Sequence, residues 1–315
     1  MSEPFVSVIV AARNAQNTLE KCLDSILNLD YPTFEVIVVN DGSYDKTEEI
    51  LKKYSGKIMS FTNPVSVGPA KARNMAAELA RGSFLCFTDA DCVVNRSWVR
   101  ELLAGFCDAT VVSVGGRQEI PENETPFGRK VASFMKKTGF VSDYARSHFS
   151  GIVPVRHNAS CNVMYRKDAF LNAGGFLEGL WPGEDVELDY RFEKEGQNIL
   201  CNSRAVVKHY RPTTWRSFAR MMFRYGWAQG FLVRKYGIFR KIQALPFIFF
   251  GLLFWFIFFV FQKFSSFLTI LGISLLAVGA WIKFDFTVFI LFWICLFCWN
   301  AGFLKGASLG RLTKK

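Results

Sequence analysis

The chain has 315 residues, half of them apolar, and a formal net charge of +11. This length suits one large domain or two. Charge is unevenly distributed, because the segment 245–304 contains only Lys263, Lys283 and Asp285 as charged residues. Its apolar runs have no polar face, which excludes a chain that is soluble throughout. The pattern predicts a soluble α/β domain followed by a membrane region.

The first predicted strand covers residues 5–12 and is apolar on both faces. Such strands are typical of a parallel sheet that helices cover on both sides. No basic segment followed by an apolar core precedes the strand, so we find no signal peptide. We therefore expect the first domain to lie in the cytoplasm, with its cysteines reduced.

Strands and helices then alternate along the chain. The pattern predicts a helix from residue 17 or 18, a strand at 34–39, a helix at 46–54, a strand at 58–61, a helix at 68–80 and a strand at 84–87. This alternation indicates a doubly wound α/β sheet. The first strand is not followed by the G-x-G-x-x-G motif, which disfavours a dinucleotide-binding protein.

Acidic residues stand where two of these strands end. Asp41 follows the second strand, and Asp89 and Asp91 follow the strand at 84–87. Ligands bind at the carboxyl ends of such strands, and buried carboxylates need partners. Mg²⁺ favours carboxylate oxygens together with substrate phosphates, so we predict a metal and diphosphate site. The alternative is a loop with two solvated aspartates.

The helix at 68–80 begins with Gly68 and Pro69 and carries Lys71 and Arg73 in its first turns. A helix N-terminus with nearby cations attracts phosphate. The alternative is a solvated basic helix face.

Four segments together resemble family 2 glycosyltransferases of the GT-A fold. They are Val6-Ser-Val-Ile-Val-Ala-Ala-Arg-Asn14, Glu35-Val-Ile-Val-Val-Asn-Asp-Gly-Ser43, the stretch from Gly68 to Asn74, and Phe87-Thr-Asp-Ala-Asp91. Each motif is weak alone, but their order and their places at strand ends are specific. The resemblance covers roughly residues 5–235. It implies a Rossmann-like, mostly parallel sheet with helices on both faces, followed here by C-terminal transmembrane helices.

The resemblance also implies a nucleotide-sugar site. Asp41 would contact the base, Lys71 and Arg73 would lie near the nucleotide, and Asp89 would face the ribose or the metal. Asp91 would bind a divalent cation, Mg²⁺ or Mn²⁺. The remaining residues implied at the donor site are Ala11, Arg13, Asn14 and Ala90. Many family members have a second acid where this chain has Asn40, so the donor could be UDP- or GDP-linked.

A second acidic motif, Glu184-Asp185, follows Gly183 at the start of a predicted helix. The helix dipole favours acids at this position, so the motif could have a purely structural role. Glycosyl transfer also needs a base to take the proton of the acceptor hydroxyl. The resemblance assigns the role of this base to the Glu-Asp motif. We favour Asp185 over Glu184 as the base, and Asp189 is a weaker candidate. In this fold family a histidine such as His209 sometimes completes the metal site.

The stretch 117–151 shows no regular pattern and is interpreted as an acceptor-facing insert or a surface excursion. The segment 208–243 is rich in basic and aromatic residues and has no Asp or Glu. It predicts a helix that lies on an anionic membrane surface. Nucleic-acid binding has the same signature, but the adjacent membrane region argues against it. Some of its cations could hold a diphosphate or an acceptor phosphate.

Three apolar runs at 246–261, 264–282 and 286–304 have nearly the length that a membrane-spanning helix needs. Basic residues at 234–241 place the first end inside. Three spans would put the basic C-terminal residues outside, so two spans remain an alternative, although we favour three. The predicted domains are a catalytic domain at 1–207, a connector at 208–243, a membrane region at 244–304 and a basic tail at 305–315.

The sequence therefore predicts a metal-dependent, inverting glycosyltransferase of the cell membrane with a cytoplasmic catalytic domain. It would move sugar from a nucleotide-sugar donor to a hydroxyl or phosphate of a lipid-linked or polyprenyl-phosphate acceptor. A processive polysaccharide synthase is one alternative, although only Thr213-Thr214-Trp215-Arg216 stands near the expected Gln-x-x-Arg-Trp motif. A non-catalytic nucleotide-sugar-binding membrane protein is another.

Overall fold

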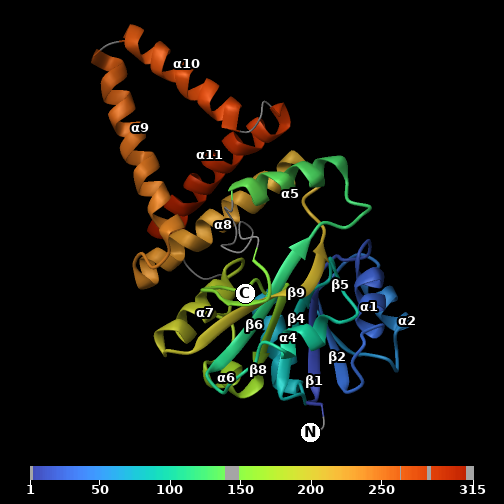
Figure 1. Ribbon diagram of the computed structural model, residues 1–315. Helices are drawn as coiled ribbons and strands as arrows, with labels where there is room; N and C mark the ends of the chain where they lie inside the picture. The colour runs from blue at the N-terminus through green and yellow to red at the C-terminus, as the bar shows by residue number, and fades with distance from the viewer. Residues whose placement is uncertain (1–2, 139–148, 263, 282–284, 310–315) are drawn as a thin grey trace. The chain divides into compact units, whose positions relative to one another are not determined.

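The computed structural model describes residues 3–138, 149–262, 264–281 and 285–309, and these form two compact units (Figure 1). The first unit contains residues 3–124 and 149–211. The second contains residues 125–138 and the described residues from 212 to 309.

The first unit is built on a nine-stranded sheet in the described part of the chain, with the order β3-β2-β1-β4-β8-β6-β9-β5 and β7 paired to β9. The strands are β1 (Val6–Ala12), β2 (Phe34–Asp41), β3 (Met59–Asn63), β4 (Phe84–Asp89), β5 (Cys92–Val94), β6 (Val111–Glu119), β7 (Ile152–Pro154), β8 (Asn162–Arg166) and β9 (Asn198–His209). The β3-β2-β1-β4 half is parallel. The other half is mixed, because β8 runs antiparallel to β4 and β6. The prediction of a mostly parallel sheet therefore holds for the first half only.

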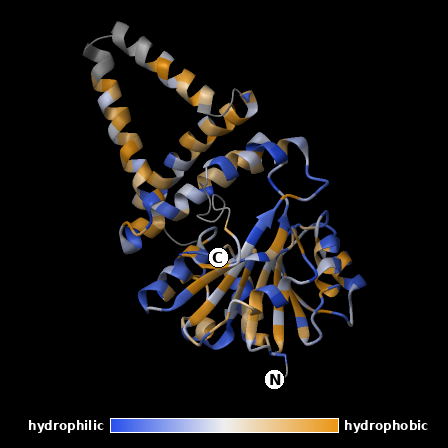
Figure 2. Ribbon diagram, viewed as in Figure 1, coloured by the Kyte–Doolittle hydropathy of each residue, from blue (hydrophilic) through white to orange (hydrophobic). Residues whose placement is uncertain are grey.

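Helices cover both faces of this sheet. On one face lie α1 (Leu19–Leu27), α2 (Thr47–Lys53) and α4 (Trp98–Leu103), and on the other lie α3 (Pro69–Leu79), α6 (Lys167–Asn172) and α7 (Glu184–Lys194). Side chains of a strand alternate between faces, so Val8 and Val10 enter the first core while Ile9 enters the second. Figure 2 shows the strands as mainly apolar. Both faces are buried, as the apolar strands of the sequence predict.

Two predictions about the second part of the chain are wrong. The stretch predicted as irregular contains the end of β6 and a helix, α5 (Pro126–Thr138), while residues 139–148 lie outside the described residues. Val131, Phe134 and Met135 of α5 are buried at helical spacing, between basic residues that hide the pattern. The apolar residues at 199–201 and 205–207 also predict two separate closing strands. They form one strand, β9, because its pairing with β6 continues past a register shift. The other predicted elements agree within about three residues.

In the second unit, α8 (Trp215–Tyr236) packs closely on α11 (Phe286–Leu309). A Cβ atom added at Gly226 would lie 2.0 Å from the Trp299 carbonyl oxygen, and one added at Gly302 would lie 2.0 Å from the Phe223 carbonyl oxygen. The two backbones can meet because glycine has no side chain at these positions. One face of α8 is therefore covered by α11. The predicted position of the segment 208–243 on a membrane surface stays a prediction.

Replacing Gly302 with alanine is expected to destabilise the second unit by about 1–3 kcal/mol, because the new methyl group overlaps backbone of α8. The matched control is Gly251→Ala in α9, where an added Cβ meets nothing within 4 Å and alanine favours the helix. The measurement is the thermal unfolding midpoint of each purified full-length variant in the same detergent. Equal midpoints for the two variants would contradict the close packing of α8 on α11.

The helix α5 belongs to this second unit as well. Its Phe134 ring meets the Phe218 ring of α8 with 5.7 Å between centroids. Lys130 of α5 forms an ion pair with Asp285, whose other carboxylate oxygen accepts a hydrogen bond from the Val288 N–H at the start of α11. These contacts tie α5 to both helices of the pair.

The C-terminal helices α9 (Leu245–Gln262), α10 (Phe264–Trp281) and α11 are strongly apolar (Figure 2). Among the described residues, Lys241–Phe258 and Phe286–Leu309 are long and apolar enough to cross a membrane. A core helix of a soluble protein can pass the same test. The first of these stretches differs from a core helix, however, because only 11% of it is buried.

Candidate active site

The predicted site residues meet at one edge of the sheet in the first unit. Strands β1, β2 and β4 are parallel, so their carboxyl ends lie at the same edge. Strand β8 is antiparallel to β4 and pairs Asn162 with Thr88, so it begins at this edge. Strand β9 ends there too, because His209 pairs with Cys92. The edge therefore gathers Asp89, Asp91 and His209 from distant parts of the sequence.

A cluster of possible metal ligands lies at this edge. One oxygen each of Asp89 and Asp91 and one ring nitrogen of His209 lie within 4.8 Å of one another. The His209 Nε2 atom is 3.4 Å from Asp91 Oδ1, and the Asp91 side chain is 47% exposed. Two carboxylates and an imidazole suit a divalent cation such as Mn²⁺, and the exposed side leaves room for substrate oxygens. These three residues would hold the cation.

Gln118 orients the imidazole of His209. The Gln118 Oε1 atom lies 3.1 Å from His209 Nδ1 and accepts a hydrogen bond of 3.0 Å from Arg211 Nη2. Arginine only donates, so the shared atom of Gln118 must be its oxygen, and Nδ1 must donate to it as well. In neutral His209 the Nε2 atom is then the free acceptor, directed at Asp91.

The charge of His209 depends on its neighbours. Burial lowers the pKa of His209, but the charges and hydrogen bonds of Asp91 and Cys161 together raise it to about 10. A proton on Nε2 would have to leave before this nitrogen could bind a cation.

Replacing Gln118 with leucine is expected to weaken Mn²⁺ binding by about 10–100-fold, because the imidazole loses the partner that fixes its tautomer. Gln118→Glu keeps an oxygen acceptor and should bind Mn²⁺ nearly as well as the unchanged protein. The measurement is a Mn²⁺ titration followed by electron paramagnetic resonance. If the leucine variant bound Mn²⁺ as well as the glutamate variant, Gln118 would have no part in orienting His209.

Arg73 is buried near this edge and forms ion pairs with two acids. It is 3% exposed; its Nη2 atom is 2.5 Å from Asp89 Oδ1 and its Nη1 atom is 2.6 Å from Glu184 Oε1. Burial raises the pKa of Glu184 to about 7, and the charge of Arg73 opposes this shift. The predicted contact of Arg73 with the nucleotide stays a prediction. The structure gives Arg73 a role in linking α3, β4 and α7.

Three acids of α7, the candidates for the catalytic base, have different surroundings. Glu184 and Asp189 are 1% and 0% exposed, whereas Asp185 is half-buried. Asp185 accepts hydrogen bonds from the Ser160 N–H at 2.9 Å and from the Val186 N–H at 2.8 Å. Asp189 instead accepts a hydrogen bond from the Asn158 N–H. Only Asp185 of these three is open to a substrate.

Asp41 holds a loop at the tip of β2. It is 2% exposed and accepts hydrogen bonds from the Asn63 and Ser66 side chains and from the Val67 and Gly68 N–H groups. A carboxylate accepts about four hydrogen bonds, so its capacity is taken up by the loop. The predicted contact with the base stays a prediction, and the geometry favours a role in shaping the loop before α3.

The other predicted donor-site residues lie around the same strand ends. Arg13 and Asn14 are exposed after β1, and Asn14 has a positive φ of 51°. Ala11 pairs with Asp89 in the sheet, and Ala90 is buried beside it. The Lys71 side chain is 42% exposed and forms an ion pair of 3.3 Å with Glu178. Nothing in their geometry tests their predicted contacts with a nucleotide.

Two residues of the site, Gln118 and Ser160, were not predicted from the sequence. Arg211 stands two residues after His209 and carries a buried Nε atom without a partner in the described chain. It was predicted only as one of the basic residues of 208–243 that could hold a phosphate, and its contact with Gln118 was not predicted. Gln118 and Ser160 carry no local signal, since only the sheet brings them to the site.

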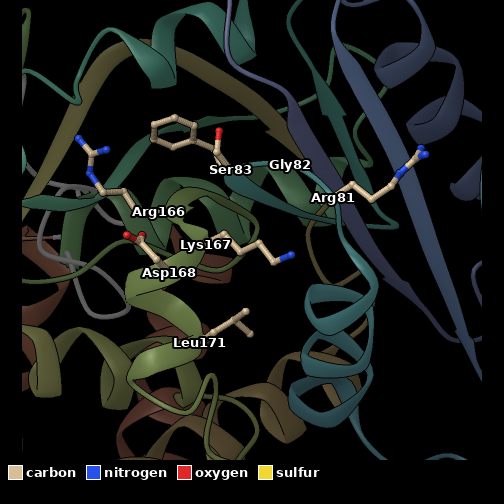
Figure 3. Close-up of a pocket in the computed structure, with 8 residues that line it drawn as sticks. Arg81, Gly82, Ser83, Arg166, Lys167, Asp168 and Leu171 are labelled. Carbon is tan, nitrogen blue, oxygen red and sulfur yellow. The ribbon is translucent and has the colours of Figure 1, made fainter.

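A pocket of about 520 Å³ lies at the opposite edge of the sheet from these residues (Figure 3). Arg81, Gly82 and Ser83 precede β4, so this pocket is at the opposite end of that strand from Asp89. Its cations are already engaged: Lys167 donates to the Ala80 carbonyl and Arg166 to the Val111 carbonyl. We assign it no part in the chemistry.

Comparison with known proteins places the chain in a family. The model of glycosyl transferase family 2 matches residues 7–172, more than half of the sequence, and the chain belongs to this family. It is 31% identical over 237 residues to the pre-mycofactocin glycosyltransferase of Mycobacterium tuberculosis. That match covers 73% of this chain but only 48% of the relative, so the chain spans about half of that relative's length.

Two further similarities extend along nearly the whole chain. A dolichyl N-acetyl-alpha-D-glucosaminyl phosphate 3-beta-D-2,3-diacetamido-2,3-dideoxy-beta-D-glucuronosyltransferase of Methanococcus voltae is 25% identical over 99% of both chains. A mannosyltransferase of Pyrobaculum calidifontis, solved with GDP-Man and Mn²⁺, superposes with a TM-score of 0.66 at 18% identity. That superposition covers 98% of this chain and 89% of the other. The predicted family and the α/β fold class are confirmed.

Proposed function

We propose that this protein is a membrane-anchored glycosyltransferase that moves a sugar from a nucleotide-sugar donor to a lipid-linked acceptor. The observation that carries the proposal is the cluster of Asp89, Asp91 and His209 at the carboxyl edge of a family 2 sheet, with the half-buried Asp185 at the same edge. The GDP-Man in complex with the Pyrobaculum mannosyltransferase and the dolichyl phosphate acceptor in the name of the Methanococcus relative support this choice.

A divalent cation bound at this cluster would neutralise the nucleoside diphosphate as it leaves. The chain supplies the remaining groups. Asp185 takes the proton of the acceptor hydroxyl, and the N–H groups of Ser160 and Val186 hold its carboxylate in place. The family resemblance implies attack from the face opposite the leaving group, and so inversion at the anomeric carbon.

The exposed apolar surface of α9 supports the membrane anchor. Leu252, Phe254 and Trp255 are 62%, 75% and 56% exposed. Apolar surface in water costs about 25 cal/mol per Å², so side chains of this size favour a lipid environment. We propose that the helices from α9 to α11 lie in the cell membrane and that the catalytic unit lies in the cytoplasm.

The test uses the full-length protein in lipid vesicles with Mn²⁺ or Mg²⁺ and a panel of UDP- and GDP-sugars labelled in the sugar. A lipid extract supplies the acceptor. We expect one donor to release its nucleoside diphosphate and its label to enter the organic phase. Equal transfer to a water-soluble acceptor without lipid would contradict the lipid-linked acceptor. Binding of a donor without turnover in any lipid would favour a non-catalytic binding protein.

A further inference from the structure

A second group of possible ligands shares His209 with the first. The sulfur atoms of Cys92 and Cys161 and a ring nitrogen of His209 lie within 4.8 Å of one another. Both cysteines are free and buried, at 0% and 4% exposed. Cys92 begins β5 opposite His209, and Cys161 directly precedes β8, so the sheet itself sets this grouping.

The two groups compete for one atom. His209 Nδ1 is engaged with Gln118, which leaves Nε2 as the ring nitrogen for either group. A single lone pair binds a single cation. A cation held by the two cysteines would therefore remove His209 from the set formed with Asp89 and Asp91.

The two groups also differ in the cations that they favour. Carboxylate oxygens suit hard cations such as Mg²⁺ and Mn²⁺, whereas thiolates suit softer ones such as Zn²⁺ and Cd²⁺. Two cysteines and one histidine, with water in the fourth position, form a known type of open tetrahedral zinc site. On binding, each thiol would release its proton to solvent and form a sulfur–metal bond.

We propose that Cys92, Cys161 and His209 form a second metal site, which binds a thiophilic cation such as Zn²⁺ and thereby displaces the hard cation of the aspartate set. Cys92 directly follows Asp91, and the side chains of His209 and Asp91 are 19% and 47% exposed. Zinc would act as a competitive inhibitor of the metal-dependent reaction. This inhibition rests on the proposed function, while the binding of the cation does not.

The binding is tested with Cd²⁺ as the probe, under reducing conditions, on the full-length protein. Cadmium bound to thiolate gives an ultraviolet charge-transfer absorption that carboxylate ligands do not give. We expect this absorption to saturate at one Cd²⁺ per chain and to be lost in Cys92→Ala and in Cys161→Ala. The control Cys201→Ala removes a buried cysteine of β9 outside the cluster and should keep the absorption. Asp91→Asn should keep it too, because the aspartate set is not needed.

Absence of the absorption in the unchanged protein would overturn the proposal, whatever the folding of any variant. Its persistence in both cysteine variants would do the same. The inhibition is measured separately. Turnover with Zn²⁺ is divided by turnover without it, at increasing concentrations of Mn²⁺. Each variant is compared with its own rate before Zn²⁺ is added. Relief of inhibition by Mn²⁺ is expected, and inhibition unaffected by Mn²⁺ would contradict competition. If no donor is ever turned over, the proposed function fails while the cadmium test still decides the site.

Discussion

Replacing Asp185 with asparagine is expected to lower kcat for sugar transfer by roughly 10²–10⁴-fold, the range by which a positioned general base accelerates proton transfer. Asparagine has nearly the same shape but cannot take a proton from the acceptor hydroxyl. Among the three candidates for the base, Glu184 and Asp189 are fully buried, so the half-buried Asp185 is the one that an acceptor can reach. Metal-dependent binding of the donor should be little changed, because Asp185 is not in the ligand set.

The matched control is Asp168→Asn. Asp168 stands at the start of α6 and accepts a hydrogen bond from the next backbone N–H at 2.8 Å, as Asp185 does at the start of α7. It is exposed and belongs to the opposite edge of the sheet, so its variant should keep normal turnover. Both variants are compared by the release of nucleoside diphosphate at saturating donor. Asp185→Asn with at least half the normal kcat would remove Asp185 from its role.

Replacing Arg73 with methionine is expected to destabilise the catalytic unit by about 3–5 kcal/mol, because the change leaves the buried Glu184 and the partly buried Asp89 carboxylates without their cation. The Arg73 side chain is 3% exposed, and its partner Glu184 is 2% exposed. For a unit of this size the unfolding midpoint should fall by roughly 6–20 °C. Arg73→Lys should also destabilise the unit, since one ammonium group cannot reproduce the two-armed contact with Asp89 and Glu184.

The control for this prediction is Arg81→Met, which removes an arginine from another ion pair in the same unit. The Arg81 side chain is 71% exposed although its partner Glu35 is largely buried. An exposed ion pair contributes about 0–1 kcal/mol, so the midpoint should change little. Thermal unfolding followed by far-ultraviolet circular dichroism gives both values. If Arg81→Met and Arg73→Met were equally stable, the buried pairs of Arg73 would have no net effect on stability.

Much of the fold follows from local sequence patterns. Apolar strands that end in polar residues predicted the edge at which Asp41, Asp89 and Asp91 lie. The four motifs were enough to predict the family, and the match of the family 2 model to residues 7–172 confirms it. His209 was placed with the metal ligands by resemblance, and the structure brings it within 4.8 Å of both aspartates. Its role as a ligand stays a prediction.

Features set by long-range contacts could not be predicted. The ion pair between Arg73 and Glu184 joins residues that are 111 apart in the sequence, so no local pattern could predict it. The predicted contact of Arg73 with a nucleotide stays a prediction. The grouping of Cys92 with Cys161 depends on how β5, β8 and β9 adjoin in the sheet. The glycines of α8 and α11 are ordinary in sequence, and only the close approach of the two helices gives them a role.

The most direct test of the central claim is nucleotide binding to the full-length protein with and without a divalent cation. Isothermal titration with UDP and GDP would be carried out on the unchanged protein and on Asp91→Asn, each with Mn²⁺ and with EDTA. We expect one nucleotide to bind with Mn²⁺ and to bind at least about tenfold more weakly with EDTA or after the substitution. Loss of a ligand weakens the binding of the cation, and the cation holds the diphosphate. Equal binding under all of these conditions would contradict a metal site at Asp89, Asp91 and His209.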